Sequence, residues 1–194
     1  HLQRTREYMT DDQRFASRRP DVLTFSTDIL QEDITLGGPL VADLVTIIST
    51  TDADFVVKLI DVFPDEYKYD DSLFPSPPGR TGGAAYPMGG YQMLVRGEIM
   101  RGKYRNSFSA PEPFTPGKIT QVKFSLPDVA HTFKKGHKLM IQVQSTWFPI
   151  IDRNPQKYIP NIFEAKESDF IKATETIYCN QQYASYIELP VMKE

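Results

Sequence analysis

The segment from Gln142 to Pro155 constrains the fold most, because a strand-like pattern ends there in a turn rich in aromatic residues and proline. Branched apolar side chains alternate with Met and Gln from Leu139 to Gln144, which is the periodicity of a half-buried strand. The single Trp of the chain, Trp147, stands where this pattern ends. The prolines that follow fix φ and remove backbone donors, so the sequence predicts a defined surface at this turn.

Most of the remaining chain has the composition of β-strands separated by turns. β-Branched and aromatic residues concentrate in residues 22–27, 34–36, 40–50, 54–63, 91–104, 119–126, 138–146 and 186–191. Both faces of segment 54–63 are apolar, which indicates an interior strand, whereas segment 119–126 has one polar face. Helical spacing occurs only at residues 163–176. We expect an all-β domain, a jelly-roll β-sandwich with one short helix near residues 163–176.

Length and composition limit the class of protein. A chain of 194 residues with 40% hydrophobic residues predicts one globular domain with its own core. The net charge of −3 and the lack of a basic stripe argue against a nucleic-acid partner. No apolar run approaches the roughly 20 residues of a membrane-spanning helix, so we expect no membrane partner. The single cysteine, Cys179, has no His or Lys beside it in sequence, which predicts a buried or inert thiol.

One long connection stands out between the predicted strands. Residues 64–90 contain five Pro and five Gly, and connections of this length in compact domains are often functional or disordered. The segment is either a solvated hairpin insertion or a flap or interface loop. In the second case Tyr67, Tyr69, Phe74 and Tyr86 are its contact residues, and the loop leaves room for a homo-oligomer interface.

Motifs that would carry chemistry are incomplete. The chain has no Gly-x-Ser-x-Gly nucleophile elbow, and its glycine-rich loop lacks the Lys-Ser/Thr of a phosphate-binding loop. His131 and His137 are six residues apart with no third His or Cys to complete a zinc set, so loop or strand-edge positions are expected. Asp52 and Asp54 lack the rest of a calcium loop and indicate a turn entering a strand. We therefore assign no catalytic residue, no metal ligand and no cofactor.

Nine short motifs, taken in order, carry a family resemblance: Arg14–Leu23, Gly38–Asp43, Thr51–Phe55, Lys58–Val62, Arg96–Arg101, Tyr104-Arg105, Pro116-Gly117, His131–His137 and Trp147–Pro155. Together they resemble the C-terminal jelly-roll domain of the serine hydrolases that include X-prolyl dipeptidyl peptidase, cocaine esterase and glutaryl acylase. The branch that looks most similar is that of the α-amino-acid ester hydrolases. Each motif alone is weak, but their ordered combination is specific and covers the chain from about residue 8 to its end. The resemblance implies a galactose-binding-domain-like sandwich.

The resemblance also implies which chemistry is missing from this chain. In that family the Ser-His-Asp triad and the oxyanion hole lie in an α/β-hydrolase domain that precedes the jelly roll and that this sequence lacks. No catalytic residue can be carried over, so the chain alone is not expected to be an enzyme. Residues 1–21 are expected to be the linker from that domain, and residues 22–194 the jelly-roll domain. The implied parent is a periplasmic or secreted serine hydrolase that acts on acyl esters, amides or X-Pro dipeptides.

The resemblance implies an accessory domain that packs on the catalytic domain of the same polypeptide and helps shape the cleft for a small acyl ester or amide substrate. Our candidates for the substrate cleft or interdomain surface are Trp147, Phe148, Tyr86 and Phe74. Binding sites favour such domain boundaries. Two alternatives stay open: Trp147 packs in the core at one end of the sandwich, and the chain is a stand-alone carbohydrate- or ligand-binding jelly roll.

Overall fold

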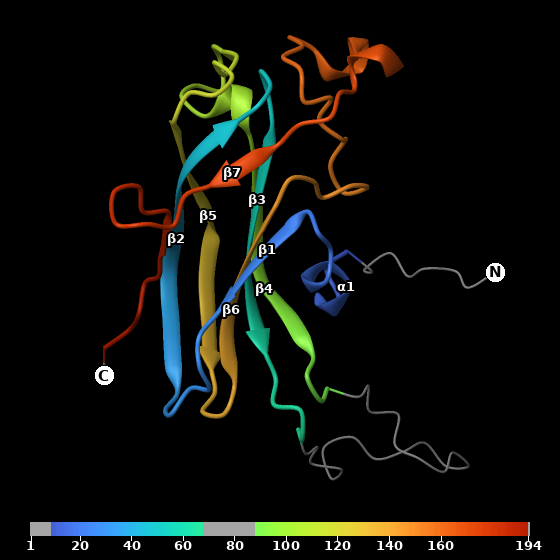
Figure 1. Cartoon of the computed structure of the whole chain (residues 1–194). Coiled ribbons are helices and arrows are strands. Elements are labelled where there is room, and N and C mark those ends of the chain that lie inside the picture. Colours follow the sequence, from blue (N-terminus) through green and yellow to red (C-terminus); the bar gives the residue numbers. More distant parts are fainter. Residues whose placement is uncertain (1–8, 68–87, 194) are drawn as a thin grey trace, which may run out of the picture.

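The computed structural model describes residues 9–67 and 88–193, which form a two-layered β-sandwich (Figure 1). The strands of this part of the chain are β1 (Val22–Ser26), β2 (Ile34–Ile48), β3 (Asp54–Val62), β4 (Gln92–Arg101), β5 (Thr120–Phe133), β6 (Lys138–Gln144), β7 (Glu175–Ile177) and β8 (Tyr186–Glu188). Helical turns are short: α1 (Arg14–Ser17) and the 3-10 turns η1 (Gly102–Tyr104), η2 (Ile162–Glu164) and η3 (Glu167–Asp169). The predicted all-β sandwich is confirmed.

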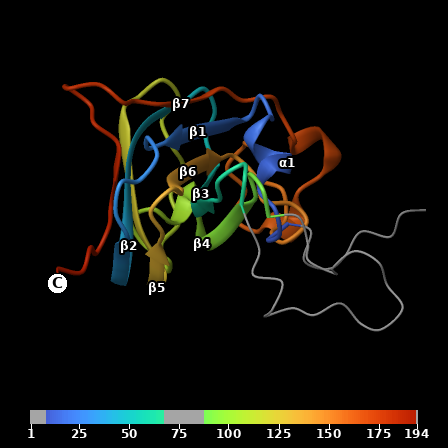
Figure 2. The same ribbon diagram turned by 90° about the horizontal axis from the view of Figure 1, so that it is seen from below.

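Two antiparallel sheets form the layers, and Figure 2 shows them edge-on. The first sheet has the order β1-β6-β3-β4. In the second sheet β2 pairs with β5 on one side, and with β7 and β8 on the other. No helix in the described ranges has the length and apolar character that crossing a membrane requires.

The core lies between the sheets and follows the alternation of side chains along the strands. From β3, Phe55, Val57 and Leu59 point into it, and from β2 the inward residues are Leu40, Ala42 and Leu44. Strand β3 is buried along nearly its whole length, which confirms the interior strand predicted from its two apolar faces. Its other face is therefore covered by something other than the second sheet.

That cover is the segment before β1. Met9 and Gln13 are buried, and α1 lies on the side of the first sheet that faces away from the second (Figures 1 and 2). Gln13 donates its backbone N–H to the carbonyl of Gln92 in β4 (2.9 Å), so the segment is tied to the sheet. The sequence assigns these residues to a linker, and the domain boundaries remain predictions.

The prediction of a short helix near residues 163–176 is wrong. Asn161 caps η2 by accepting the N–H of Phe163 (3.2 Å), and Asp169 accepts the N–H of Lys166 (2.9 Å). Such local bonds from side chain to backbone compete with a continuous helix. The apolar spacing also has no core to face, since Phe163 is 85% exposed. The segment consists of two separate 3-10 turns and ends in β7, a strand that the sequence pattern missed.

A glycine and a proline that are typical of turns, Gly38 and Pro127, lie inside strands. Gly38, with φ of 131°, forms a bulge in β2, so the predicted segments 34–36 and 40–50 are one long strand. β5 continues through Pro127 to Phe133, beyond its predicted end. A proline is tolerated there because β5 is the edge strand of its sheet and needs no donor on its outer side.

Candidate interdomain surface

A buried cation marks the outer face of the first sheet. Lys58, in the middle of β3, is fully buried and donates a hydrogen bond from Nζ to Gln13 Oε1 (2.8 Å). The same Nζ lies 4.8 Å from the ring centre of Trp147 and 5.7 Å from that of Phe15. Burial, and then the charge of Arg19, lower the pKa of Lys58 to about 7. The segment before β1 is thus held to the sheet by a polar contact inside an apolar layer.

Trp147 belongs to this layer. Its side chain is 8% exposed, and its Nε1 donates to the backbone oxygen of Met9 (3.3 Å). The ring packs with Met9 and Val56, and it fits because residue 97 on β4 is glycine. A Cβ at Gly97 would lie 2.7 Å from the Trp147 ring, closer than carbon atoms pack. The side chain of Trp147 is therefore buried within the chain, although in this outer layer and not in the core between the sheets as the alternative for this residue expected.

The turn after Trp147 presents apolar side chains to solvent. Phe148 is 53% exposed and Ile150 is 47% exposed. The Arg153 guanidinium lies 5.5 Å from the ring centre of Phe148 and 5.7 Å from that of Phe170, so it bridges two aromatic rings. Ile171, next to Phe170, donates its N–H to the backbone oxygen of Pro155 at the end of the turn (3.0 Å). We call this surface the Phe148 patch: Phe148, Ile150, Arg153, Phe170 and Ile171.

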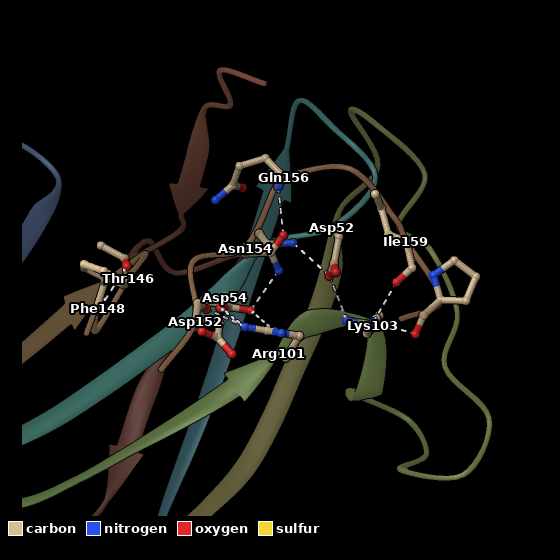
Figure 3. A network of polar contacts seen from close by, with 12 residues as sticks. Asp52, Asp54, Arg101, Lys103, Thr146, Phe148, Asp152, Asn154, Gln156 and Ile159 are labelled. Carbon is tan, nitrogen blue, oxygen red and sulfur yellow. Dashed lines mark hydrogen bonds and ion pairs between the residues drawn. The ribbon is translucent and has the colours of Figure 1, made fainter. Parts of the chain in front are cut away.

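Buried polar groups hold the turn in place (Figure 3). The Asp54 carboxylate accepts two hydrogen bonds from Arg101, both at 3.1 Å, and a third from Asn154 Nδ2 at 2.8 Å. Arg101 also donates to the backbone oxygen of Asp152 (2.7 Å), and Asn154 Oδ1 accepts the N–H of Gln156 (2.8 Å). A bidentate pair with extra hydrogen bonds is geometrically specific. The strands β3 and β4 thus fix the loop that displays the Phe148 patch.

A second anchor lies further along the same loop (Figure 3). Lys103 is 3% exposed, and its Nζ donates to the backbone oxygens of Ile159 (2.7 Å) and Pro160 (3.1 Å). Its own N–H donates to Asp52 Oδ1 (3.0 Å). The Asp52 and Asp54 pair, expected to be a turn entering a strand, is at the start of β3 and serves as a buried acceptor site.

Three carboxyl groups near this loop have a raised pKa. Burial raises the pKa of Asp52 and of Asp54, against the hydrogen bonds that lower it. Burial, followed by the charges of Asp54 and Asp52, raises the pKa of Glu175 in β7 to about 8. Within the described ranges no group of three or more His, Cys, Asp or Glu side chains is arranged to hold a metal ion. The arrangement therefore supports a structural role.

The two histidines meet at the opposite end of the sandwich. His131 Nε2 lies 2.9 Å from Asp61 Oδ2, and His137 Nδ1 lies 2.7 Å from Asp61 Oδ1. His131 is in the edge strand β5 and His137 is in the turn before β6, as their expected positions required. The shared carboxylate, 70 or more positions away in sequence, was not predicted. The pairing of β3 with β6, had it been predicted, would have placed Asp61 near His137, whereas His131 reaches the carboxylate from the second sheet.

The candidate surface residues of the sequence divide into three groups. Trp147 is buried, and Phe148 is exposed. Tyr86 and Phe74, with most of the 64–90 loop, lie outside the described residues. Phe170 and Ile171 were not among the candidates, because the sequence pattern assigned them to one face of the helix expected at residues 163–176. Their apolar character, in the segment that follows a Pro-rich turn, was a usable signal. Cys179 is exposed, so of the two expected alternatives the buried thiol is wrong and the inert thiol stays a prediction.

Comparisons with known proteins identify the family of the chain. The family described as the X-Pro dipeptidyl-peptidase C-terminal non-catalytic domain matches residues 4–188. The chain belongs to this family. The resemblance inferred from the nine motifs is confirmed, and so is the non-catalytic, accessory character of the domain.

Relatives of this family member are longer proteins. Cocaine esterase from Rhodococcus sp. (strain MB1 Bresler) is 30% identical over 94% of this chain and 27% of its own length. A solved α-amino acid ester hydrolase superposes with a TM-score of 0.83 and 45% identity, over 95% of this chain and 28% of the other. An aminopeptidase from a marine sediment archaeon, Thaumarchaeota archaeon, superposes with a TM-score of 0.82 and 39% identity, over 96% of this chain and 28% of the aminopeptidase. The chain thus spans little more than a quarter of the relatives it matches.

Proposed function

We propose that this domain packs, through the Phe148 patch, on an α/β-hydrolase catalytic domain of the same polypeptide and helps shape its substrate cleft. The expected parent is a serine hydrolase of the α-amino-acid ester hydrolase, acylase or X-Pro dipeptidyl peptidase type. The family description and the names of the relatives, which include an ester hydrolase and an aminopeptidase, support such a parent. Such a parent transfers an acyl group from a small ester or amide substrate through an acyl-enzyme intermediate.

The observation that carries the proposal is the rigidity of an exposed apolar surface. Soluble monomers rarely build large contiguous apolar patches, and those that occur are often interaction sites. Here Phe148 and Phe170 are 53% and 42% exposed, yet the loop beneath them is fixed by the buried Asp54, Arg101 and Lys103 contacts. A pre-ordered aromatic surface loses little side-chain entropy when a partner covers it.

The position of the patch agrees with a partner that precedes the domain. In Figure 1 the loop that carries the patch and α1, the first helix of the chain, lie on the same side of the sandwich. A catalytic domain joined to the N-terminal side would therefore meet this face without a long connection. Arg153, held between two aromatic rings, adds a charge that can pair with a carboxylate on the partner.

The test is a binding measurement between this domain and a separately produced catalytic domain. We expect Phe148→Ala and Phe170→Ala each to raise the dissociation constant at least tenfold, because an aromatic side chain buried in an interface contributes about 2 kcal/mol or more to the binding free energy. Phe108→Ala is the matched control, since Phe108 is 79% exposed and lies outside the patch. Calorimetry gives the affinities, and thermal melts show that each variant is folded. Equal affinities for the patch variants and the control would contradict the proposal.

A further inference from the structure

The sandwich is open along one of its two long edges. At one edge β4 of the first sheet lies against β5 of the second. At the other edge β1 pairs only with β6, while β7 and β8 pair only with β2, and no strand of the described residues joins them. Strands β7 and β8 have three residues each, so they cover only parts of the fifteen-residue β2.

Core-facing side chains of β1 are half exposed as a result. Leu23 is opposite Val143, and Phe25 is opposite Ile141, so both share the inner face of the sheet. Leu23 is 43% exposed and Phe25 is 44% exposed, whereas Val143 is 7% exposed. Apolar residues on the inner face of a sandwich are normally buried between its sheets. Nothing in the described ranges covers these two.

A groove runs along this edge. One hollow, of about 320 Å³, is lined mainly by Phe25, Ile141, Val143, Ile177, Ile187 and Leu189. A second hollow, of about 290 Å³, shares Val143 and Ile177 with the first and extends past Leu23 to Ser145 and Ala173. We call the two together the edge groove. Two polar side chains at its rim are already bonded, since Tyr186 donates to Asp43 and Ser185 accepts the N–H of Val45.

One lip of the groove is a free strand edge. Thr27, just after β1, donates its N–H to the backbone oxygen of Leu139 (3.0 Å). In an antiparallel pair the hydrogen-bonded positions alternate, so Leu23 and Phe25 bond to β6 as Thr27 does. Thr24 and Ser26 therefore turn their N–H and C=O groups away from β6. β1 contains no Lys or Pro, the residues that natural proteins use to block pairing at exposed edges.

We propose that the edge groove holds an extended strand of the preceding catalytic domain, with apolar side chains at alternate positions. The strand pairs with Thr24 and Ser26 through its backbone, and every second side chain enters the hollow beside Phe25 and Ile187. This is β-strand addition, in which main-chain hydrogen bonds give affinity and side-chain pockets give specificity. The inference rests on the proposed function, because it takes the occupant from that domain.

The choice of occupant follows from the continuity of the groove with the Phe148 patch. The groove opens at Ser145, just before the turn that carries Phe148, and at Ala173, just after Ile171. α1, at the start of the described chain, contacts β1 directly. A catalytic domain seated on the patch is thus next to the groove and at high effective concentration. A second copy of this chain could offer its own β1, and that arrangement is an outcome of the test.

Amide hydrogen exchange distinguishes these arrangements. The measurement compares the domain alone with the domain in its full polypeptide, at Thr24 and Ser26. We expect both amides to exchange rapidly in the domain alone and about 100-fold or more slowly in the polypeptide. The amides of Leu23 and Phe25 are the internal control, since their bonds to β6 protect them in both samples.

Each other outcome overturns the inference in a distinguishable way. If Phe148→Ala weakens docking but Thr24 and Ser26 stay unprotected in the polypeptide, the proposed function stands and the strand pairing fails. If the catalytic domain does not dock, both fail. If the two amides become protected in the domain alone as its concentration rises, a second copy occupies the edge. Phe25→Glu, which places a charge in the groove, provides a second readout: docking falls at least tenfold while the melting temperature of the domain alone is kept.

Discussion

At the residue scale, Lys58 links the pH of the solution to the stability of the fold. Its pKa is about 7 in the folded chain, against 10.5 for a lysine exposed to water. Between these values the unfolded chain binds a proton that the folded chain has released. The free energy of unfolding therefore rises with pH in this window, by at most about 1.4 kcal/mol per pH unit. The Gln13 oxygen and the Trp147 ring favour the charged form, so they oppose the effect of burial and narrow the pH window over which stability rises.

Lys58→Met tests this assignment. The variant keeps the long apolar stem and removes the charge, so we expect it to lose most of the rise in stability between about pH 7 and pH 10. Urea unfolding at several pH values gives the free energies. Lys157→Met is the matched control, because the Lys157 side chain is 52% exposed and pairs with Asp169 at the surface. A rise in Lys58→Met as steep as in the native chain would contradict the burial of a titrating ammonium group.

Glu175 has the opposite dependence on pH. Its pKa is raised from 4.5 to about 8, first by burial and then by the charges of Asp54 and Asp52. Between these values the folded chain holds a proton that the unfolded chain has released, so stability is lost as pH rises toward 8. Glu175→Gln should remove this loss and be more stable than the native chain at about pH 9, by roughly 1–3 kcal/mol. Unfolding curves at about pH 5 and pH 9 would show it, and a variant less stable at both would contradict it.

At the element scale, Trp147 joins the end of β6 to β4 and to the segment before β1. Trp147→Ala empties the space between Gly97 and Met9, and we expect a loss of about 3–5 kcal/mol in the free energy of unfolding. Phe148→Ala, one position later but exposed, should cost less than about 1 kcal/mol. Denaturant melts compare the two. A small loss for Trp147→Ala would return this residue to the candidates for an interdomain surface.

The elements differ in how far the sequence predicted them. β3 and β6 were readable, because burial on both faces leaves a continuous apolar run and burial on one face leaves a pattern of period two. β8 lies within the predicted segment 186–191 but is shorter, whereas β7 was missed, since three residues carry little pattern and its pairing with β2 is set by the sheet. The predicted helix failed because apolar spacing does not report whether a core faces it.

The candidate surface was predicted only in part for a related reason. Phe148 follows from a local signal, an aromatic residue beside a Pro-locked turn. Arg153 and Phe170 are seventeen positions apart in sequence, and Asp54 and Asn154 are a hundred positions apart. Contacts of this separation depend on sheet register, which one sequence does not reveal. The family resemblance supplied the accessory role from ordered motifs, and the geometry supports the Phe148 patch as the proposed surface.

At the scale of the whole molecule, some faces and edges of the two sheets are covered by other parts of the chain and others are not. The outer face of the first sheet is covered by the segment before β1, and one edge is closed by β4 and β5. The Phe148 patch and the edge groove remain uncovered, and they adjoin one another near Ser145 and Ala173. The two sheets bury a core of their own, but the inward side chains of β1 at the open edge are half exposed. In the proposed function, the catalytic domain covers these side chains and the Phe148 patch.

The isolated chain should have no esterase or aminopeptidase activity. Acyl transfer needs a nucleophile hydrogen-bonded to a base that a third group orients. Asp61 does orient His131 and His137, but neither ring hydrogen-bonds to a Ser or Cys side chain in the described ranges. We expect no turnover of a nitrophenyl acyl ester or an X-Pro anilide above a buffer blank, and the same result for His131→Ala and His137→Ala. Turnover that survives repurification, is abolished by a serine-directed inhibitor and falls in the histidine variants would contradict this expectation and make the Asp61 cluster catalytic.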